Sequence, residues 1–121
     1  MKMTNYEADV HLQELSGLQT LSVNIPATVG YRILQNIHAL SNALEPFHEA
    51  VDNAVRSHSG GAETINREQD PAAFDACARE ITELRQIGMD VPVHTIRISQ
   101  IENVELPVSA LFALDFMLEK E

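Results

Sequence analysis

The sequence has no tryptophan, one cysteine, few basic residues and no long hydrophobic run. Its single cysteine, Cys77, excludes an internal disulfide bond, which suits a reducing compartment. No apolar stretch approaches the roughly 20 residues that a membrane-spanning helix requires. The N-terminal segment lacks the apolar centre of a signal peptide. Together these absences predict a cytoplasmic protein.

Basic residues are scarce, with 8 Lys and Arg against 18 Asp and Glu, which gives a formal net charge of −10. A surface of this charge repels nucleic-acid phosphates and anionic lipids, so we expect no direct binding to nucleic acid or to membrane. A basic protein surface, in contrast, would be attracted to it. The acidic residues are spread along the chain, which also fits a role in solubility alone.

The remaining composition is that of a folded globular protein. Hydrophobic residues make up 45% of the 121 residues, and with only 2 Tyr and 4 Phe the core is expected to consist mainly of Leu, Ile, Val and Ala. A chain of this length is expected to form one domain, residues 1–121. Within it, residues 57–70 are polar and contain a glycine pair, which predicts a flexible loop.

The strongest structural signal is an amphipathic helix over residues 26–58. Its apolar positions recur in steps of three and four and therefore share one face. They are Ile33, Ile37, Leu40, Leu44, Phe47, Val51 and Ala54. The polar positions of the opposite face are His38, Asn42, Glu45, Glu49, Asp52 and Arg56. Pro46 removes a backbone donor inside this pattern, so we expect either one kinked helix or two helices that meet at residues 45–46.

A shorter helix is predicted before it from Thr4 and Glu7, which form a capping-box pattern. We expect this helix to end near Gly17. Its expected inward side chains are Tyr6, Val10 and Leu15. Residues 18–25 then alternate apolar and polar side chains and predict a short strand. The apolar side chains of that strand are Leu21, Val23 and Ile25.

A third helix is predicted from Asp70 and Pro71, an N-cap followed by a first-turn proline, to near Gly88. Its expected buried stripe is Phe74, Cys77, Ala78, Ile81, Leu84 and Ile87. A second strand is expected over residues 91–98, with Ile96 and Ile98 on one face. Residues 101–106 are expected to form a connection or a short third strand.

Pro107 is expected to open a C-terminal helix that is apolar nearly all round. Such a helix is either deeply buried or contacts a partner as well as the core. The candidate partner-interface residues are therefore Val108, Leu111, Phe112, Phe116 and Met117. The predicted fold is a small single α+β domain in the order α-β-α-α-β-α, in which one long amphipathic helix packs with a two- to three-stranded sheet.

No residue pattern predicts catalysis, a cofactor or a metal. His48 and Asp52 resemble half of a zinc-hydrolase helix, but the second position requires histidine and no spacing supplies a third ligand. Cys77 lies in an apolar stripe, which favours a core thiol over a nucleophile. The glycine pair at residues 60–61 lacks the lysine and hydroxyl of a phosphate-binding loop. We therefore expect a protein that is not an enzyme and holds no cofactor.

Several short motifs follow one another along nearly the whole chain. They are the Ile25-Pro26 step into Tyr31-Arg-Ile-Leu-Gln-Asn36, then Leu44-Glu-Pro-Phe47, Asp70-Pro-Ala-Ala-Phe74 and the terminal Met117-Leu-Glu-Lys-Glu121. In this layout the chain resembles a family of small uncharacterised proteins from tailed phages and prophages, a domain of unknown function. Because the motifs consist of core and cap residues, the resemblance implies a fold and transfers no catalytic residue.

The resemblance implies a phage or prophage accessory protein that is found in the cytoplasm of the bacterial host or associated with the virion. The expected function is that of a virion structural or assembly component whose C-terminal helix docks on a larger protein, with homo-oligomer formation left open. The alternative is an acidic inhibitor that sequesters or blocks a host anti-phage defence protein, because a charge of −10 would steer it to a basic surface.

Overall fold

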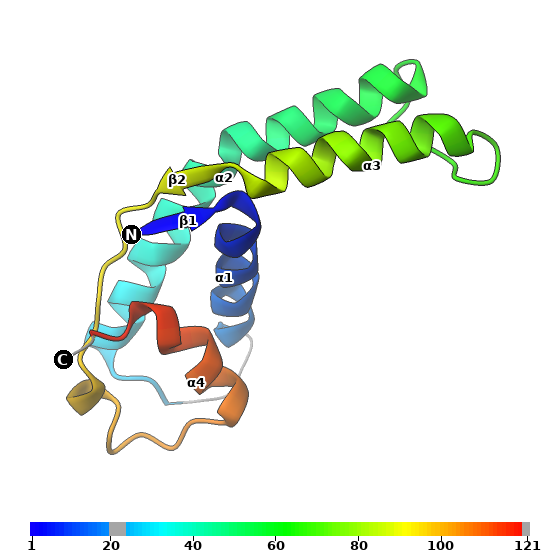
Figure 1. Cartoon of the computed structure of the whole chain (residues 1–121). Helices are drawn as coiled ribbons and strands as arrows, with labels where there is room; N and C mark the ends of the chain where they lie inside the picture. Colours follow the sequence, from blue (N-terminus) through cyan, green and yellow to red (C-terminus); the bar gives the residue numbers. More distant parts are fainter. Residues whose placement is uncertain (20–23, 120–121) are drawn as a thin grey trace.

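The computed structural model describes residues 1–19 and 24–119 and is broadly α+β (Figure 1). Its elements in chain order are β1 (Lys2–Thr4), α1 (Asn5–Leu18), α2 (Ala27–Ser59), α3 (Pro71–Gln86), β2 (Gly88–Asp90) and α4 (Val108–Leu114). Short 3₁₀ helices cover Ile98–Gln100 and Asp115–Met117. The two strands form an antiparallel sheet in which Lys2 lies opposite Asp90.

The predicted order of elements is wrong at the N-terminus, because the described chain begins with a strand. The predicted first strand, residues 18–25, falls largely on residues 20–23, which lie outside the described part, as do its side chains Leu21 and Val23. At its two ends, Leu18 belongs to α1 and Ile25 has irregular backbone. The strand that pairs with β2 is instead the tripeptide that precedes α1.

The predicted second strand is also displaced. The strand is β2, at residues 88–90, and residues 91–95 have irregular backbone. Ile96 makes one isolated parallel bridge to Leu118 and is buried, whereas Ile98 begins a 3₁₀ helix and is 57% exposed. Residues 101–106 form a connection of turns and irregular backbone. Of the two alternatives for this segment, a connection or a short third strand, the connection is observed.

The capping box at the start of α1 is confirmed. The Thr4 hydroxyl accepts from the Glu7 amide at 3.1 Å, and the Thr4 amide donates to the Glu7 carboxylate at 3.0 Å. The Thr4 amide, and to a lesser extent the Thr4 side chain, hold the pKa of Glu7 below its usual value, because a hydrogen bond to the carboxylate favours its charged form. The helix passes through Gly17 to Leu18, one residue beyond the expected end. Of its expected inward side chains Leu15 is buried and Val10 half-buried, but Tyr6 is 57% exposed and that prediction is wrong.

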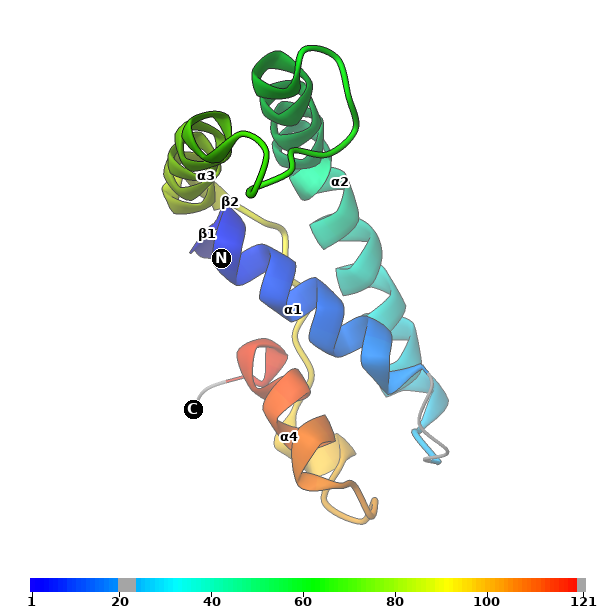
Figure 2. The same cartoon turned by 90° about the vertical axis from the view of Figure 1, so that its right-hand side faces the viewer.

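The long helix α2 is continuous from residue 27 to residue 59 and contains Pro46 in its interior. Its ribbon changes direction between the cyan and green parts in two perpendicular views, as expected for a kinked helix (Figures 1 and 2). Every position of the predicted apolar stripe is buried or half-buried, and every position of the predicted polar stripe is exposed. The amphipathic pattern is therefore confirmed, and the proline bends the helix without ending it.

The second half of α2 and α3 lie side by side as a helical arm that projects from the rest of the chain (Figure 1). α2 extends to Ser59, three residues into the predicted loop, and ends at Gly60, whose φ of 72° is the left-handed cap conformation that glycine adopts without strain. In α3, Cys77 is buried and Phe74, Ile81 and Leu84 are half-buried. The predicted burial of Ala78 and Ile87 is wrong. Both are exposed, and Ile87 lies just beyond the end of the helix.

Replacing the N-cap of α3 tests how much this cap stabilises the arm. The Asp70 carboxylate accepts from the Ala73 amide at 3.1 Å, as the sequence predicts. We expect Asp70→Ala to lower the free energy of unfolding by about 1 kcal/mol in urea titrations. Glu68→Ala, an exposed change in the same loop, is the matched control. Equal effects of the two substitutions would contradict a capping role.

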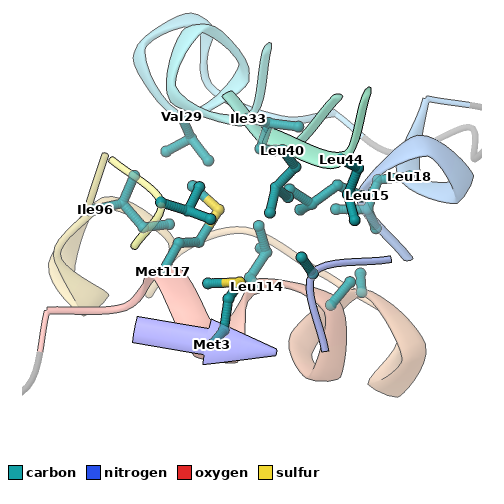
Figure 3. Close-up of a cluster of buried hydrophobic side chains, with 14 of the residues drawn as sticks. Met3, Leu15, Leu18, Val29, Ile33, Leu40, Leu44, Ile96, Leu114 and Met117 are labelled. Atoms are coloured by element: carbon teal, nitrogen blue, oxygen red, sulfur yellow. The ribbon is translucent and has the colours of Figure 1, made fainter. Parts of the chain in front are cut away.

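The hydrophobic core joins the strands, α1, the first half of α2 and the C-terminal segment. Figure 3 shows side chains from these elements converging, with Leu15 and Leu44 on one side and Ile96 and Met117 on the other. α1 packs against α2 and also against α4, so it links the long helix to the C-terminal one (Figure 2). The core consists of Leu, Ile, Val, Ala and Met with one Phe, in agreement with the composition.

Candidate functional site

The short helix α4 exposes three large apolar side chains on one side. Val108, Leu111 and Phe112 are 66%, 45% and 72% exposed, respectively. Their spacing of three and four residues places them together on one face of the helix. We call these three residues the α4 face. Because contiguous exposed apolar side chains on a soluble protein mark interaction surfaces, the α4 face is the candidate site.

The opposite side of α4 is fully packed. Ala110 and Leu114 have no exposed surface, and Ala113 is 3% exposed. Pro107 is the N-cap that precedes the helix, and its carbonyl accepts from the amides of Ala110 at 3.0 Å and Leu111 at 3.2 Å. A proline before the first turn costs no intrahelical hydrogen bond, because the amides of that turn have no partner inside the helix. The α4 face is therefore presented by a helix that is anchored along its other side.

The residues that follow α4 are tied to an irregular segment from earlier in the chain. The Ile96 amide donates to the Met117 carbonyl at 2.9 Å, and the Glu119 amide donates to the Ile96 carbonyl at 2.8 Å. An exposed ion pair between Arg97 and Glu119, with N–O distance 3.4 Å, lies at the same place. These contacts hold the residues that follow α4 in place. The buried side of α4 holds the helix itself in place.

A buried amide on α2 holds this irregular segment. Asn36 has no exposed surface, and its side-chain oxygen accepts from the His94 amide at 2.7 Å. Its side-chain nitrogen donates to the His94 carbonyl at 2.8 Å and contacts the Met117 sulfur at 3.4 Å. The Asn36 side chain thus satisfies the backbone of His94, as a neighbouring strand would do in a sheet. Through it α2 is connected both to the irregular segment at His94 and to Met117 after α4.

The five predicted interface residues divide into two groups. The structure places Val108, Leu111 and Phe112 together at the surface, whereas Phe116 is half-buried and Met117 has no exposed surface. Met117 is therefore a core residue, and its assignment to an interface is wrong. The reason is that the α-helix ends at Leu114 and the following 3₁₀ turn directs Met117 inward against Asn36.

Phe116 stacks on a histidine of α1. The ring centroids of His11 and Phe116 are 4.0 Å apart and the ring planes differ by 16°. The Nδ1 atom of His11 is buried without a hydrogen-bond partner. Burial lowers the pKa of His11 from its usual 6.5, and the negative charges of Glu14 and Glu7 oppose this shift. The contact between α1 and the C-terminal turn is thus formed by a neutral imidazole.

This contact predicts a pH-dependent contribution to stability. Because the unfolded chain binds a proton at His11 at a higher pH than the folded chain does, the free energy of unfolding falls as the pH is lowered below about 6.5, until the folded imidazole is also protonated. His11→Phe keeps a stacked ring and removes the orphan nitrogen, so at pH 7 we expect it to stabilise the fold by about 1 kcal/mol. The gain should grow as the pH falls to 5 in thermal or urea unfolding. A gain that stays constant with pH would contradict this role of His11.

The other candidate positions form structural contacts. His48 pairs with Asp9 across α1 and α2 at 3.5 Å, and His58 pairs with Glu80 across the arm at 3.2 Å. Within residues 1–19 and 24–119, no group of three or more His, Cys, Asp or Glu side chains is placed to hold a metal ion. Cys77 is buried, and this burial raises the pKa of its thiol, with a smaller contribution from Glu80.

Among the described helices, none combines the length and the apolar character that crossing a membrane would require. Comparison of the chain with protein-family models, with curated protein sequences and with solved structures found no match. The resemblance to small proteins of tailed phages therefore stays a prediction.

Two features of the site were not predicted from the sequence. The role of Asn36 was missed, although it lies three residues after Ile33 and four before Leu40, in phase with the buried stripe, and a polar residue in an apolar stripe is a recognisable signal. Asp115 also lies next to the α4 face, a position that was not predicted from the sequence. It is exposed, and it follows Leu111 by four residues and Phe112 by three, so it continues the α4 face by one turn.

Proposed function

We propose that this chain is a non-enzymatic accessory protein of a tailed phage or prophage that acts by binding another protein through the α4 face, most simply as a virion structural or assembly component. The observation that carries the proposal is the exposure of Val108, Leu111 and Phe112 on a helix that is anchored along its other side. Because the three side chains are already partly covered, completing their burial would contribute about 1–2 kcal/mol each. The resemblance stated above supplies the phage context.

The anchoring of α4 supports a binding role because a preformed face loses little conformational entropy on association. The bridge at Ile96 and the contact of Asn36 with Met117 hold the segment that follows the helix, and the buried residues Ala110, Ala113 and Leu114 pack its inner side. The α4 face consists of three apolar side chains, which is the composition of the buried centre of a protein–protein interface.

The proposal is tested by quantitative capture from lysates of bacteria that produce the phage or carry the prophage. Phe112→Ser removes the most exposed member of the α4 face, and Tyr31→Ser removes an aromatic side chain of similar exposure, 61%, near the start of α2. We expect at least one defined protein to be retained by the natural chain and by Tyr31→Ser, and to be reduced tenfold or more, about 1.4 kcal/mol, by Phe112→Ser. Equal retention by all three chains would overturn the proposal.

The alternative function is an acidic inhibitor that blocks a host anti-phage defence protein, and the observation that favours it is the net charge of −10. Such an inhibitor would be steered to a basic surface, so its association rate should fall steeply as the salt concentration rises. A rate independent of salt would contradict the inhibitor. Size-exclusion chromatography with light scattering at two salt concentrations measures the molar mass of the pure protein. A mass above that of one chain would indicate a homo-oligomer, which neither function requires.

A further inference from the structure

We infer that the partner of the α4 face is a helix whose apolar side chains are bordered by lysine or arginine. The inference rests on the proposed function and specifies the chemistry of the partner.

Exposed acidic residues flank α4 in the chain. Asp115 is exposed and extends the face by one turn beyond Phe112. Glu105 is exposed and precedes Val108 by three residues, on the other side of Pro107. A partner that covers the apolar side chains therefore approaches the Asp115 carboxylate, and it must either leave this group hydrated at the rim or supply an opposite charge.

The same part of the chain is poor in bases. Residues 98–119 include no lysine or arginine, and the one base after them, Lys120, lies outside the described part of the chain. The nearest preceding base, Arg97, already pairs with Glu119 at 3.4 Å. The charged residues next to the α4 face in the chain are therefore mainly acidic, and the attraction of a carboxylate for a cation strengthens as a contact excludes water. Lysine or arginine beside apolar side chains is the complementary pattern.

The geometry of the face matches a helix. Val108 and Leu111 are separated by three residues, and Val108 and Phe112 by four, so the exposed side chains form the short rows that pack against the rows of another helix. α4 has only 7 residues, about 10 Å of helix, so a single partner helix suffices to cover the face.

A second copy of this chain is a poor occupant. A symmetric contact would bring the α4 faces together by a twofold axis, so each copy would meet the other's Asp115 with a face that is itself bordered by Asp115. Like charges brought together in an interface oppose association. The charges therefore favour a different, basic protein.

The test uses two synthetic peptides of about 18 residues, each about 27 Å long as a helix. Both carry leucine at positions spaced by three and four residues, and they differ only in having lysine or glutamate on the polar side. Calorimetric titration measures the dissociation constant of each peptide with the natural chain. We expect the lysine peptide to bind at least about tenfold more tightly than the glutamate peptide.

Variants locate the binding site. Phe112→Ser is expected to weaken binding of the lysine peptide tenfold or more, and Tyr31→Ser to leave it unchanged. The pair Glu105→Gln and Asp115→Asn should weaken it about fivefold. The pair Glu45→Gln and Asp52→Asn changes the net charge equally on the outer face of α2 and should have less than a twofold effect.

Three results would overturn the inference. If both peptides bind equally and depend on Phe112, the apolar face binds helices but charge does not select them. If both charge pairs weaken the lysine peptide equally and Phe112→Ser has no effect, the attraction belongs to the whole acidic surface. If neither peptide binds, the partner is not such a helix. In the first and third cases the capture experiment still tests the proposed function separately.

Discussion

Asn36→Ala is expected to lower the free energy of unfolding by about 3–4 kcal/mol, because each buried group that loses its hydrogen bond costs about 1–3 kcal/mol. The substitution leaves both the amide and the carbonyl of His94 without the partner that now holds them at 2.7 and 2.8 Å. It also removes the contact to the Met117 sulfur. Since domains of this size are stable by only about 5–15 kcal/mol, much of the stability depends on this one side chain.

Urea unfolding measures the change, and Asn42→Ala is the matched control. Asn42 lies on the exposed face of the same helix, and we expect its replacement to change stability by less than about 0.5 kcal/mol. Amide hydrogen exchange gives a second measurement, because the His94 amide should lose protection only in Asn36→Ala. A cost of less than about 1 kcal/mol with His94 still protected would contradict the bridging role of Asn36.

Leu114→Ala is expected to cost about 3 kcal/mol, within the range for removing a leucine from a packed core. Leu114 has no exposed surface and joins α4 to the core cluster that contains Met117 and Leu44. The cavity that remains cannot close easily, because the neighbouring Ala110 and Ala113 already bring the backbone of α4 close to its neighbours.

Leu111→Ala makes the same chemical change on the other side of the same helix. Leu111 is 45% exposed, so we expect its replacement to cost less than about 1 kcal/mol. By the proposed function, Leu111→Ala weakens partner binding while Leu114→Ala mainly lowers stability. Thermal unfolding of the two variants side by side measures this difference. Equal losses of stability would mean that α4 is not packed on one side only.

The features that were predicted correctly depend on residues close in sequence. Thr4 with Glu7, and Asp70 with Pro71, mark helix starts because a cap is formed within one turn. The apolar stripe of α2 is equally local, since its spacing follows from helix geometry. Pro46 left a choice between a bent and a broken helix, and the stripe, which keeps its phase past the proline, indicated the continuous helix that is observed.

The features that were missed depend on partners far apart in the chain. β1 and β2 have three residues each, too short to show alternation, and they pair residues 2–4 with residues 88–90. The strand predicted at residues 91–98 is not formed. The backbone of His94 is hydrogen-bonded by Asn36, 58 positions away in the chain, and not by a neighbouring strand. Local pattern cannot specify such a contact.

The candidate site was predicted in part for the same reason. The apolar character of residues 108–118 indicated an interface, but it could not show which side of the helix the core would cover. That division depends on where the α-helix gives way to the 3₁₀ turn after Leu114, which directs Met117 inward.

The central claim is that the α4 face is covered by another protein, and site-specific photo-crosslinking tests it most directly. Photo-reactive benzoylphenylalanine would replace Phe112 in one chain and Tyr31, an aromatic residue of similar exposure, in another. Both chains would be illuminated in bacteria that produce the phage or carry the prophage. We predict one defined adduct with a different protein from position 112 and none of that mass from position 31. No adduct from position 112, or the same adducts from both positions, would contradict the claim.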